Sequence, residues 1–170
     1  MAVANVARGR MLLTAALTVY GLYYLFVPDH FGLIDNVDLA IHETGHLVFG
    51  PLGEFLGYLG GTLLQLLFPV TFAWYFWRHG DRHAATVAAW WIAQNCWNIS
   101  VYVKDARAQE LPLVGGGEHD WAYLLEQLGL LEQDQAVGTA VRVAGTLIFA
   151  YAALRGYTYA RSSEGPVSTA

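Results

Sequence analysis

The pentapeptide His42-Glu43-Thr44-Gly45-His46 is the part of the chain best suited to carry chemistry. On a helix, residues four apart project from one face, so the two imidazoles can bind a single metal ion. Glu43 then stands beside the metal, where a carboxylate can take a proton from a water molecule. With 6 histidines among 170 residues, a chance match to this pattern is expected only roughly 0.01 times. The motif therefore predicts a zinc site, and a purely structural role is the alternative.

A third ligand must come from elsewhere, because a catalytic zinc ion usually has three protein ligands. The run Gly115-Gly116-Gly117-Glu118-His119-Asp120 is typical of a flexible segment that delivers a ligand to the start of a helix. His119 and Asp120 are equal candidates for that ligand, and Asp105 ranks behind them. Asp120 is also a good N-cap for a helix over residues 121–131, a role that needs no metal.

A second polar group consists mainly of amides. Gln94, Asn98 and Asp105 are spaced by four and seven residues, which places them on one face of a helix. Gln65 lies in another apolar segment. Polar groups inside a bilayer are costly, so they usually face a partner or a cavity. These residues are expected to hydrogen-bond to the metal ligands or the substrate, or simply to hold the helices together, and both uses stay open.

The elements that must position these residues are long apolar segments. Hydrophobic residues make up 55% of the chain and charged residues 14%, about half the usual charged share. Crossing a bilayer takes about 20 apolar residues. Segments that meet this length lie at about 11–27, 55–77, 84–103 and 136–157.

Charge and cysteine content exclude several other classes of protein. The single cysteine, Cys96, excludes a disulfide within the chain and any metal cluster held by several thiolates. The net charge of −5 and the absence of a basic stripe argue against a nucleic-acid partner. The expected surroundings are instead the lipid bilayer and, for a subunit of a complex, other membrane proteins.

Arginines are distributed unevenly around the four apolar segments. They precede the first, lie between the second and third, and follow the fourth: Arg8, Arg10, Arg78, Arg82, Arg155 and Arg161. Because positive loops stay in the cytoplasm, this pattern predicts an integral membrane protein with cytoplasmic N- and C-termini. The histidine motif and the glycine-rich loop would then face the exoplasmic, or periplasmic, side.

The predicted fold is an all-α polytopic membrane protein with four transmembrane helices. Segment 35–50, which carries the motif, is too short to cross, so a re-entrant or interfacial helix is expected there. Asn36 or Asp35 would be its N-cap, and Gly50-Pro51 would end it. A second interfacial helix precedes the last span. Residues 1–160 would form a single domain, followed by a polar tail over 161–170.

The motif resembles a known family when its surroundings are included. Its apolar setting and the Gly60-Gly61-x-x-x-Gln65 segment in the next span resemble the site-2 protease family of intramembrane zinc metallopeptidases. The resemblance covers about residues 36–70. It implies that His42 and His46 bind zinc and that Glu43 activates water. The third ligand of that family is an aspartate in a Leu-Asp-Gly-like motif, and this chain contains no such triplet.

Two functions are consistent with these observations. The first is a membrane-embedded zinc-dependent hydrolase, most simply a peptidase, with its site near the exoplasmic face. The alternative is a non-catalytic structural or assembly subunit of a larger membrane protein complex that keeps a metallopeptidase-like scaffold.

Overall fold

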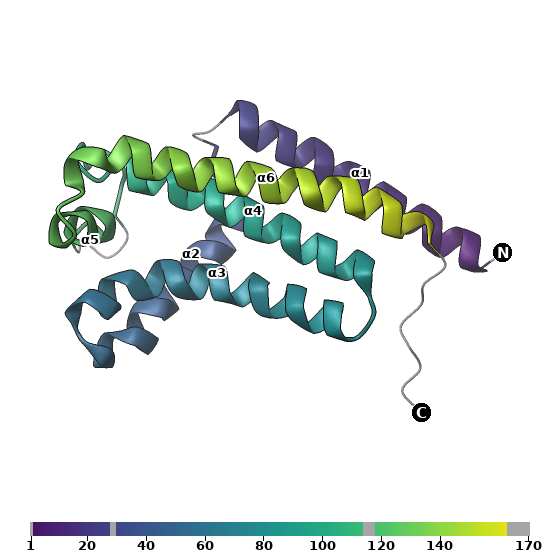
Figure 1. The fold of residues 1–170 in the computed structure, drawn as a ribbon, viewed down its shortest axis with the longest axis horizontal. Helices are drawn as coiled ribbons and strands as arrows, with labels where there is room; N and C mark the ends of the chain where they lie inside the picture. Colours follow the sequence, from purple (N-terminus) through teal and green to yellow (C-terminus); the bar gives the residue numbers. More distant parts are fainter. Residues whose placement is uncertain (1, 28–29, 114–117, 163–170) are drawn as a thin grey trace.

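The regular structure of the chain is helical (Figure 1). The computed structural model describes residues 2–27, 30–113 and 118–162, and the predicted all-α fold is confirmed for them. The glycine run at 115–117 and most of the predicted tail lie outside the described residues. Within these ranges there are six α-helices and two short 3-10 turns: α1 (Ala2–Phe26), α2 (Leu33–Phe49), η1 (Gly50–Leu52), α3 (Glu54–Arg78), α4 (Arg82–Lys104), α5 (Asp120–Gln127), η3 (Leu131–Gln133) and α6 (Asp134–Arg161).

The four predicted spans coincide with the long helices α1, α3, α4 and α6. Among the described helices, however, only two are long and apolar enough to cross a membrane, Glu54–Arg78 and Leu131–Arg161. The prediction of four such spans is therefore corrected to two. Polar residues explain the shortfall, because α4 carries amides such as Gln94 and Asn98, while threonines and tyrosines interrupt the apolar run of α1.

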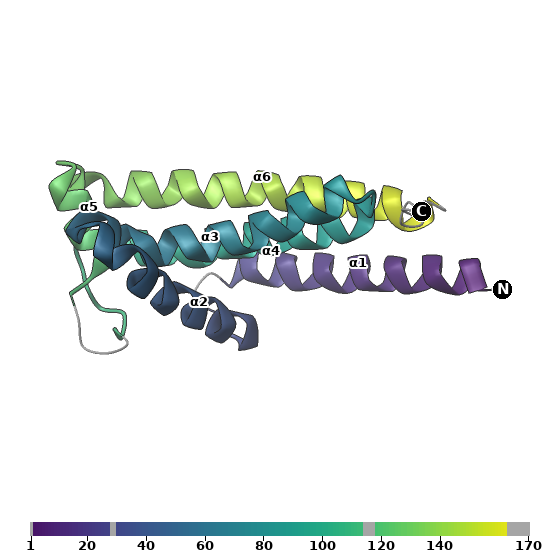
Figure 2. The ribbon, with the colours of Figure 1, turned by 90° about the horizontal axis from the view of Figure 1, so that it is seen from below.

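The long helices form a bundle with α4 at its centre. α6 packs along α4, α1 packs against both, and α3 lies against another side of α4 (Figure 1). α2 packs mainly on α3 and lies at an angle to the long helices (Figure 2). One apolar core joins α1, α4 and α6, and its small and aromatic members let the helices pack closely: Tyr24, Trp90, Ala93, Trp97, Phe149 and Ala152.

Ionic and backbone contacts hold the end of the bundle that faces α5. Arg107, just after α4, pairs with Glu132 at 3.0 Å and with Asp134 at 2.8 Å, which joins it to the start of α6. Arg142 of α6 donates to the carbonyl oxygen of Leu25 at 3.0 Å and so caps the end of α1. The end of α1 is thereby tied to α6.

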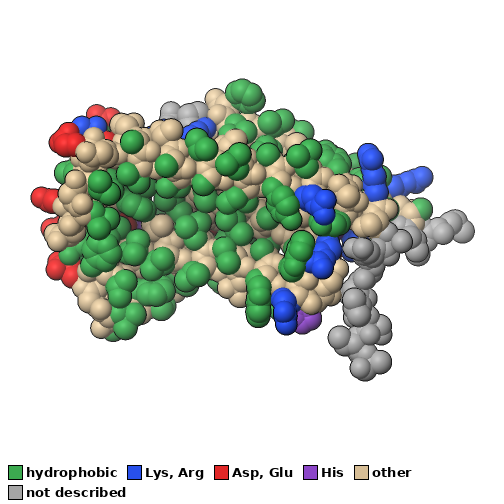
Figure 3. All heavy atoms as spheres, viewed as in Figure 1, with side chains coloured by type: hydrophobic (Ala, Val, Ile, Leu, Met, Phe, Trp, Pro, Cys, Tyr) green, Lys and Arg blue, Asp and Glu red, His purple; other side chains and the backbone are tan. Residues whose placement is uncertain are grey.

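Charged side chains gather at the two ends of the molecule, with an apolar surface between them. In Figure 3 the acidic side chains lie at the end formed by α5, and most of the basic ones lie toward the opposite end, where α1 begins and α6 ends. The long helices expose large apolar side chains between these ends, including Leu12, Val19, Leu67, Trp74, Leu147 and Leu154. Such a surface suits contact with lipid or with other apolar helices.

Candidate metal centre

The histidine motif lies on α2. The predicted end of this helix is correct, but its predicted start is not. The N-cap is Gly32, so the prediction of Asn36 or Asp35 is wrong. Asp35 instead lies in the first helical turn and accepts the backbone N–H of Gly32 at 2.7 Å. The predicted end at Gly50-Pro51 is confirmed, because α2 stops at Phe49 and these residues form η1.

Glycines bring α2 and α3 into direct contact at the motif. A methyl group on Gly45 would overlap the backbone carbonyl of Gly60. A methyl group on Gly61 would lie 2.5 Å from Nε2 of His42, so the imidazole rests on the bare backbone of α3. Gly60 and Gly61 therefore allow α2 and α3 to approach closely, and they set the position of the first histidine ring.

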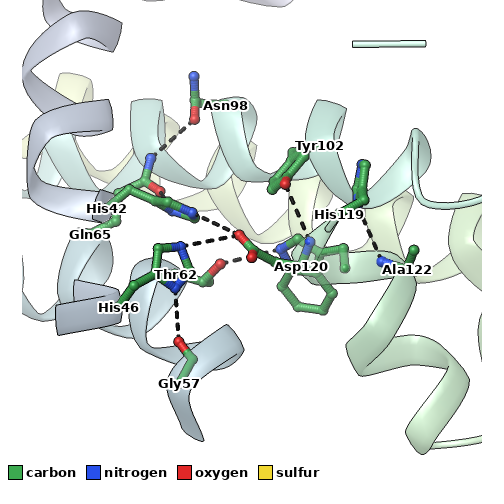
Figure 4. A network of polar contacts seen from close by, with 11 residues as sticks. His42, His46, Gly57, Thr62, Gln65, Asn98, Tyr102, His119, Asp120 and Ala122 are labelled. Carbon is green, nitrogen blue, oxygen red and sulfur yellow. Dashed lines mark hydrogen bonds and ion pairs between the residues drawn. The ribbon is translucent and has the colours of Figure 1, made fainter. Parts of the chain in front are cut away.

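His42, His46 and Asp120 form a group whose geometry could hold a metal ion. One ligand atom from each lies within 4.8 Å of the others. Oδ2 of Asp120 is 2.9 Å from Nε2 of His42 and 3.3 Å from Nε2 of His46. The three side chains point toward one another from α2 and α5 (Figure 4). Two imidazole nitrogens and one carboxylate oxygen are a donor set that zinc accepts in catalytic sites.

The helix α5 presents Asp120, and the residue before it acts as the cap. His119 is the N-cap of α5, where its Nδ1 accepts the backbone N–H of Ala122 at 3.2 Å. The predicted cap at Asp120 is therefore wrong, whereas the helix predicted over 121–131 is confirmed in part, since α5 covers Asp120–Gln127. Nε2 of His119 faces Oδ2 of Asp105 at 3.3 Å and not the pair on α2. Of the two candidate third ligands, the structure brings Asp120 to the histidines.

Asp105 and Tyr102 support this arrangement from the end of α4. The carboxylate of Asp105 accepts the backbone N–H groups of Glu110 at 2.9 Å and Leu111 at 3.1 Å, so it organises the loop that leads toward α5. The hydroxyl of Tyr102 accepts the backbone N–H of Asp120 at 3.3 Å (Figure 4). Sequence reasoning missed Tyr102, because a tyrosine in a predicted span is more simply an interfacial anchor.

The pKa shifts of Asp120 and His46 fit a cation-binding site. Burial raises the pKa of Asp120, but its hydrogen bonds with His42 and His46 outweigh that effect and lower the pKa. The same contact with Asp120 raises the pKa of His46 to about 9, against the opposing effect of burial. A proton thus lies between His46 and Asp120 near neutral pH. A metal ion at this position would take the place of that proton.

The predicted amides form a continuous polar chain behind His42. Oε1 of Gln65 lies 3.1 Å from Nδ1 of His42, and Nε2 of Gln65 donates to Oδ1 of Asn98 at 3.0 Å (Figure 4). Asn98 donates in turn to Asp35 at 3.0 Å, and Gln94 donates to the same oxygen at 2.8 Å. Gln65 and Asn98 therefore connect to a candidate ligand, whereas Gln94 reaches it only through Asp35.

A cavity of about 770 Å³ opens beside the three candidate ligands. Glu43 is exposed on its wall next to the two histidines. Five carboxylate residues and no Lys or Arg line the part of the cavity that the structure describes: Asp35, Glu43, Glu54, Glu118 and Asp120. The volume is in the range of small-molecule and cofactor sites. Its charge favours a neutral or cationic occupant over an anion.

Gly61→Ala is expected to remove metal binding although it changes no ligand. Its methyl group would displace the His42 ring, because only 2.5 Å separates the new carbon from Nε2. Zinc content of the purified variant, measured by mass spectrometry of the metal, should fall to background. Gly57→Ala in the same helix is the control, since its methyl group would meet only the Gly50 Cα at 3.4 Å. Equal zinc content in both variants would contradict this account of the ring's position.

Comparison with known proteins leaves the chain without an assigned family, since no family model, no curated protein and no solved structure matches it.

Proposed function

We propose that this protein is a membrane-embedded zinc-dependent hydrolase, most simply a peptidase. The observation that carries the proposal is the convergence of His42, His46 and Asp120 beside a cavity that also exposes Glu43. The same two histidines and the same glutamate are the residues to which the resemblance to site-2 proteases assigns zinc binding and water activation. The reaction proposed is hydrolysis of a peptide or a related amide.

Each residue of the site has a role in this reaction. When bound, zinc would lower the pKa of a coordinated water and polarise the substrate carbonyl. Glu43 takes the proton from the attacking water and passes it to the leaving amine. Tyr102 lines the cavity, and none of the described residues accepts a hydrogen bond from its hydroxyl group. The hydroxyl can therefore donate to the substrate carbonyl oxygen, which gains negative charge during the reaction. The acidic walls select neutral or cationic substrates.

The proposed location places the bundle in a membrane with the site near its exoplasmic face. Two helices are long and apolar enough to cross, and apolar side chains separate the charged ends (Figure 3). The basic end, where α1 begins and α6 ends, would face the cytoplasm by the positive-inside rule. α5 lies at the opposite end, so substrates would reach the cavity from the exoplasmic side.

The metal content of the purified protein tests the proposal most directly. The detergent-purified chain is expected to retain close to one zinc ion per chain, and His46→Ala is expected to lose it. His79→Ala is the control, because His79 is an exposed histidine that follows α3 and donates only locally, to the backbone carbonyl of Tyr75. A folded wild-type protein that neither retains nor takes up zinc would refute the proposed function.

A further inference from the structure

We infer that Asp35 is a positioning residue for the metal ligand His42, acting through Asn98 and Gln65. It anchors a one-way chain of hydrogen bonds that decides which nitrogen of the imidazole is free to bind a metal. The inference rests on the proposed metal site and adds to it a residue that lines the adjoining cavity but bonds to none of the three candidate ligands. Nothing in the sequence motif points to Asp35, which precedes His42 by two helical turns.

Both carboxylate oxygens of Asp35 accept hydrogen bonds. Its side chain is buried, with 1% of its surface exposed. Oδ1 accepts from Gln94 at 2.8 Å and from Asn98 at 3.0 Å. Oδ2 accepts from the backbone N–H of Gly32 at 2.7 Å and from the hydroxyl of Tyr24 at 2.5 Å. Four donors from three directions occupy both oxygens, which is the full capacity of a carboxylate.

This acceptor sets the direction of every hydrogen bond between it and the histidine. Because Asp35 only accepts, Asn98 must turn its amide nitrogen toward it and its oxygen toward Gln65. Gln65 must then present its nitrogen to Asn98 and its oxygen to His42. The proton between Gln65 and His42 therefore belongs to Nδ1 of the imidazole.

The consequence for His42 is a fixed orientation and a fixed tautomer. With a proton held on Nδ1, Nε2 is the nitrogen left to bind a metal, and it faces Asp120 at 2.9 Å. His46 also holds a proton on Nδ1, since this atom lies 2.8 Å from the backbone carbonyl of Gly57, which can only accept. Both Nε2 atoms are thus directed at the metal position. The carboxylate at the far end of the chain also makes His42 a stronger ligand, as carboxylates hydrogen-bonded to ligating histidines do.

Asp38 provides a matched control on the same helix. It is equally buried, with 1% exposure, and accepts from Nε1 of Trp91 on α4 at 2.8 Å. It lies one turn from Asp35 and shares Gln94 with it as a partner, but its contacts do not include Asn98 or Gln65, the two side chains that connect Asp35 to His42. If zinc affinity fell only because the contact between α2 and α4 was damaged, Asp35→Ala and Asp38→Ala would both lower it.

The test compares zinc affinity in Asp35→Ala, Asp38→Ala, Gln65→Ala and the Asp35→Ala/Gln65→Ala double variant, measured by competition with a chelator. Asp35→Ala and Gln65→Ala are each expected to weaken binding about 10- to 100-fold, the usual effect of losing a partner of a ligating histidine. The double variant should bind zinc no more weakly than the weaker-binding of the two single variants, because both substitutions break the same chain of hydrogen bonds. Asp38→Ala should bind zinc within about threefold of wild type, because it leaves the bonds between Asp35, Asn98, Gln65 and His42 in place.

A spectroscopic measurement separates positioning from a loss of fold. In the cobalt-loaded protein, the Nδ1 protons of His42 and His46 should give two shifted, exchangeable proton signals. One of them should exchange faster with solvent in Asp35→Ala, and both should stay unchanged in Asp38→Ala. Losses that multiply in the double variant, or equal losses in Asp35→Ala and Asp38→Ala, would overturn the role of Asp35 while leaving the metal site intact. A wild-type protein without zinc affinity would remove the metal site itself, and the inference with it.

Discussion

Glu43→Gln is expected to lower the rate of hydrolysis by at least about 100-fold while leaving zinc content unchanged, since general-base catalysis contributes about 10²- to 10⁴-fold. Glutamine has nearly the same shape as glutamate but cannot take a proton from water. Glu43 is exposed in the cavity and is not one of the three candidate ligands, so the metal should remain. The change therefore separates chemistry from metal binding.

Hydrolysis can be detected before the natural substrate is known. The zinc-loaded protein is incubated in ¹⁸O-labelled water with a complex peptide mixture, and mass spectrometry records new termini that carry the label. Glu54→Gln is the control, because Glu54 is another carboxylate on the wall of the same cavity. Equal labelling by wild type and Glu43→Gln would contradict the assigned base. Zinc binding without any labelled product in the wild type would favour the alternative of a structural subunit.

Asp120→Ala is expected to weaken zinc binding about 100-fold or more, beyond the 10- to 100-fold typical of outer partners. The carboxylate lies 2.9 Å and 3.3 Å from the two imidazole nitrogens, so its removal takes away one of three ligand groups. His119→Asn should keep zinc binding close to wild type. Asparagine can replace the histidine as N-cap of α5, and His119 itself faces Asp105.

These two variants decide between the neighbouring candidates for the third ligand. Both are measured by competition with a chelator of known zinc affinity, and α-helical content by circular dichroism shows that the fold is kept. Strong binding by Asp120→Ala together with weak binding by His119→Asn would reverse the assignment. Such a result would require α5 to rotate about its own axis when the metal binds, so that His119 takes the place of Asp120.

Local patterns in the sequence determined the all-helical fold and two of the three candidate ligands. The spacing of His42 and His46 places both imidazoles on one helical face, because that relation depends only on the geometry of a single helix. The four long helices follow from runs of apolar residues, and the end of α2 at Phe49 follows from Gly50-Pro51. Each of these features is set by residues within a few positions of one another.

Only the tertiary structure decided which residues complete the site. Asp120 and His119 are adjacent and chemically equal as candidates, and the difference arises because Asp105 engages His119 while α5 turns Asp120 toward α2. The link from Asp35 to His42 passes through side chains of α3 and α4, so no single segment contains it. The packing of separate helices determines these contacts, so the spacing of residues within one segment cannot predict them.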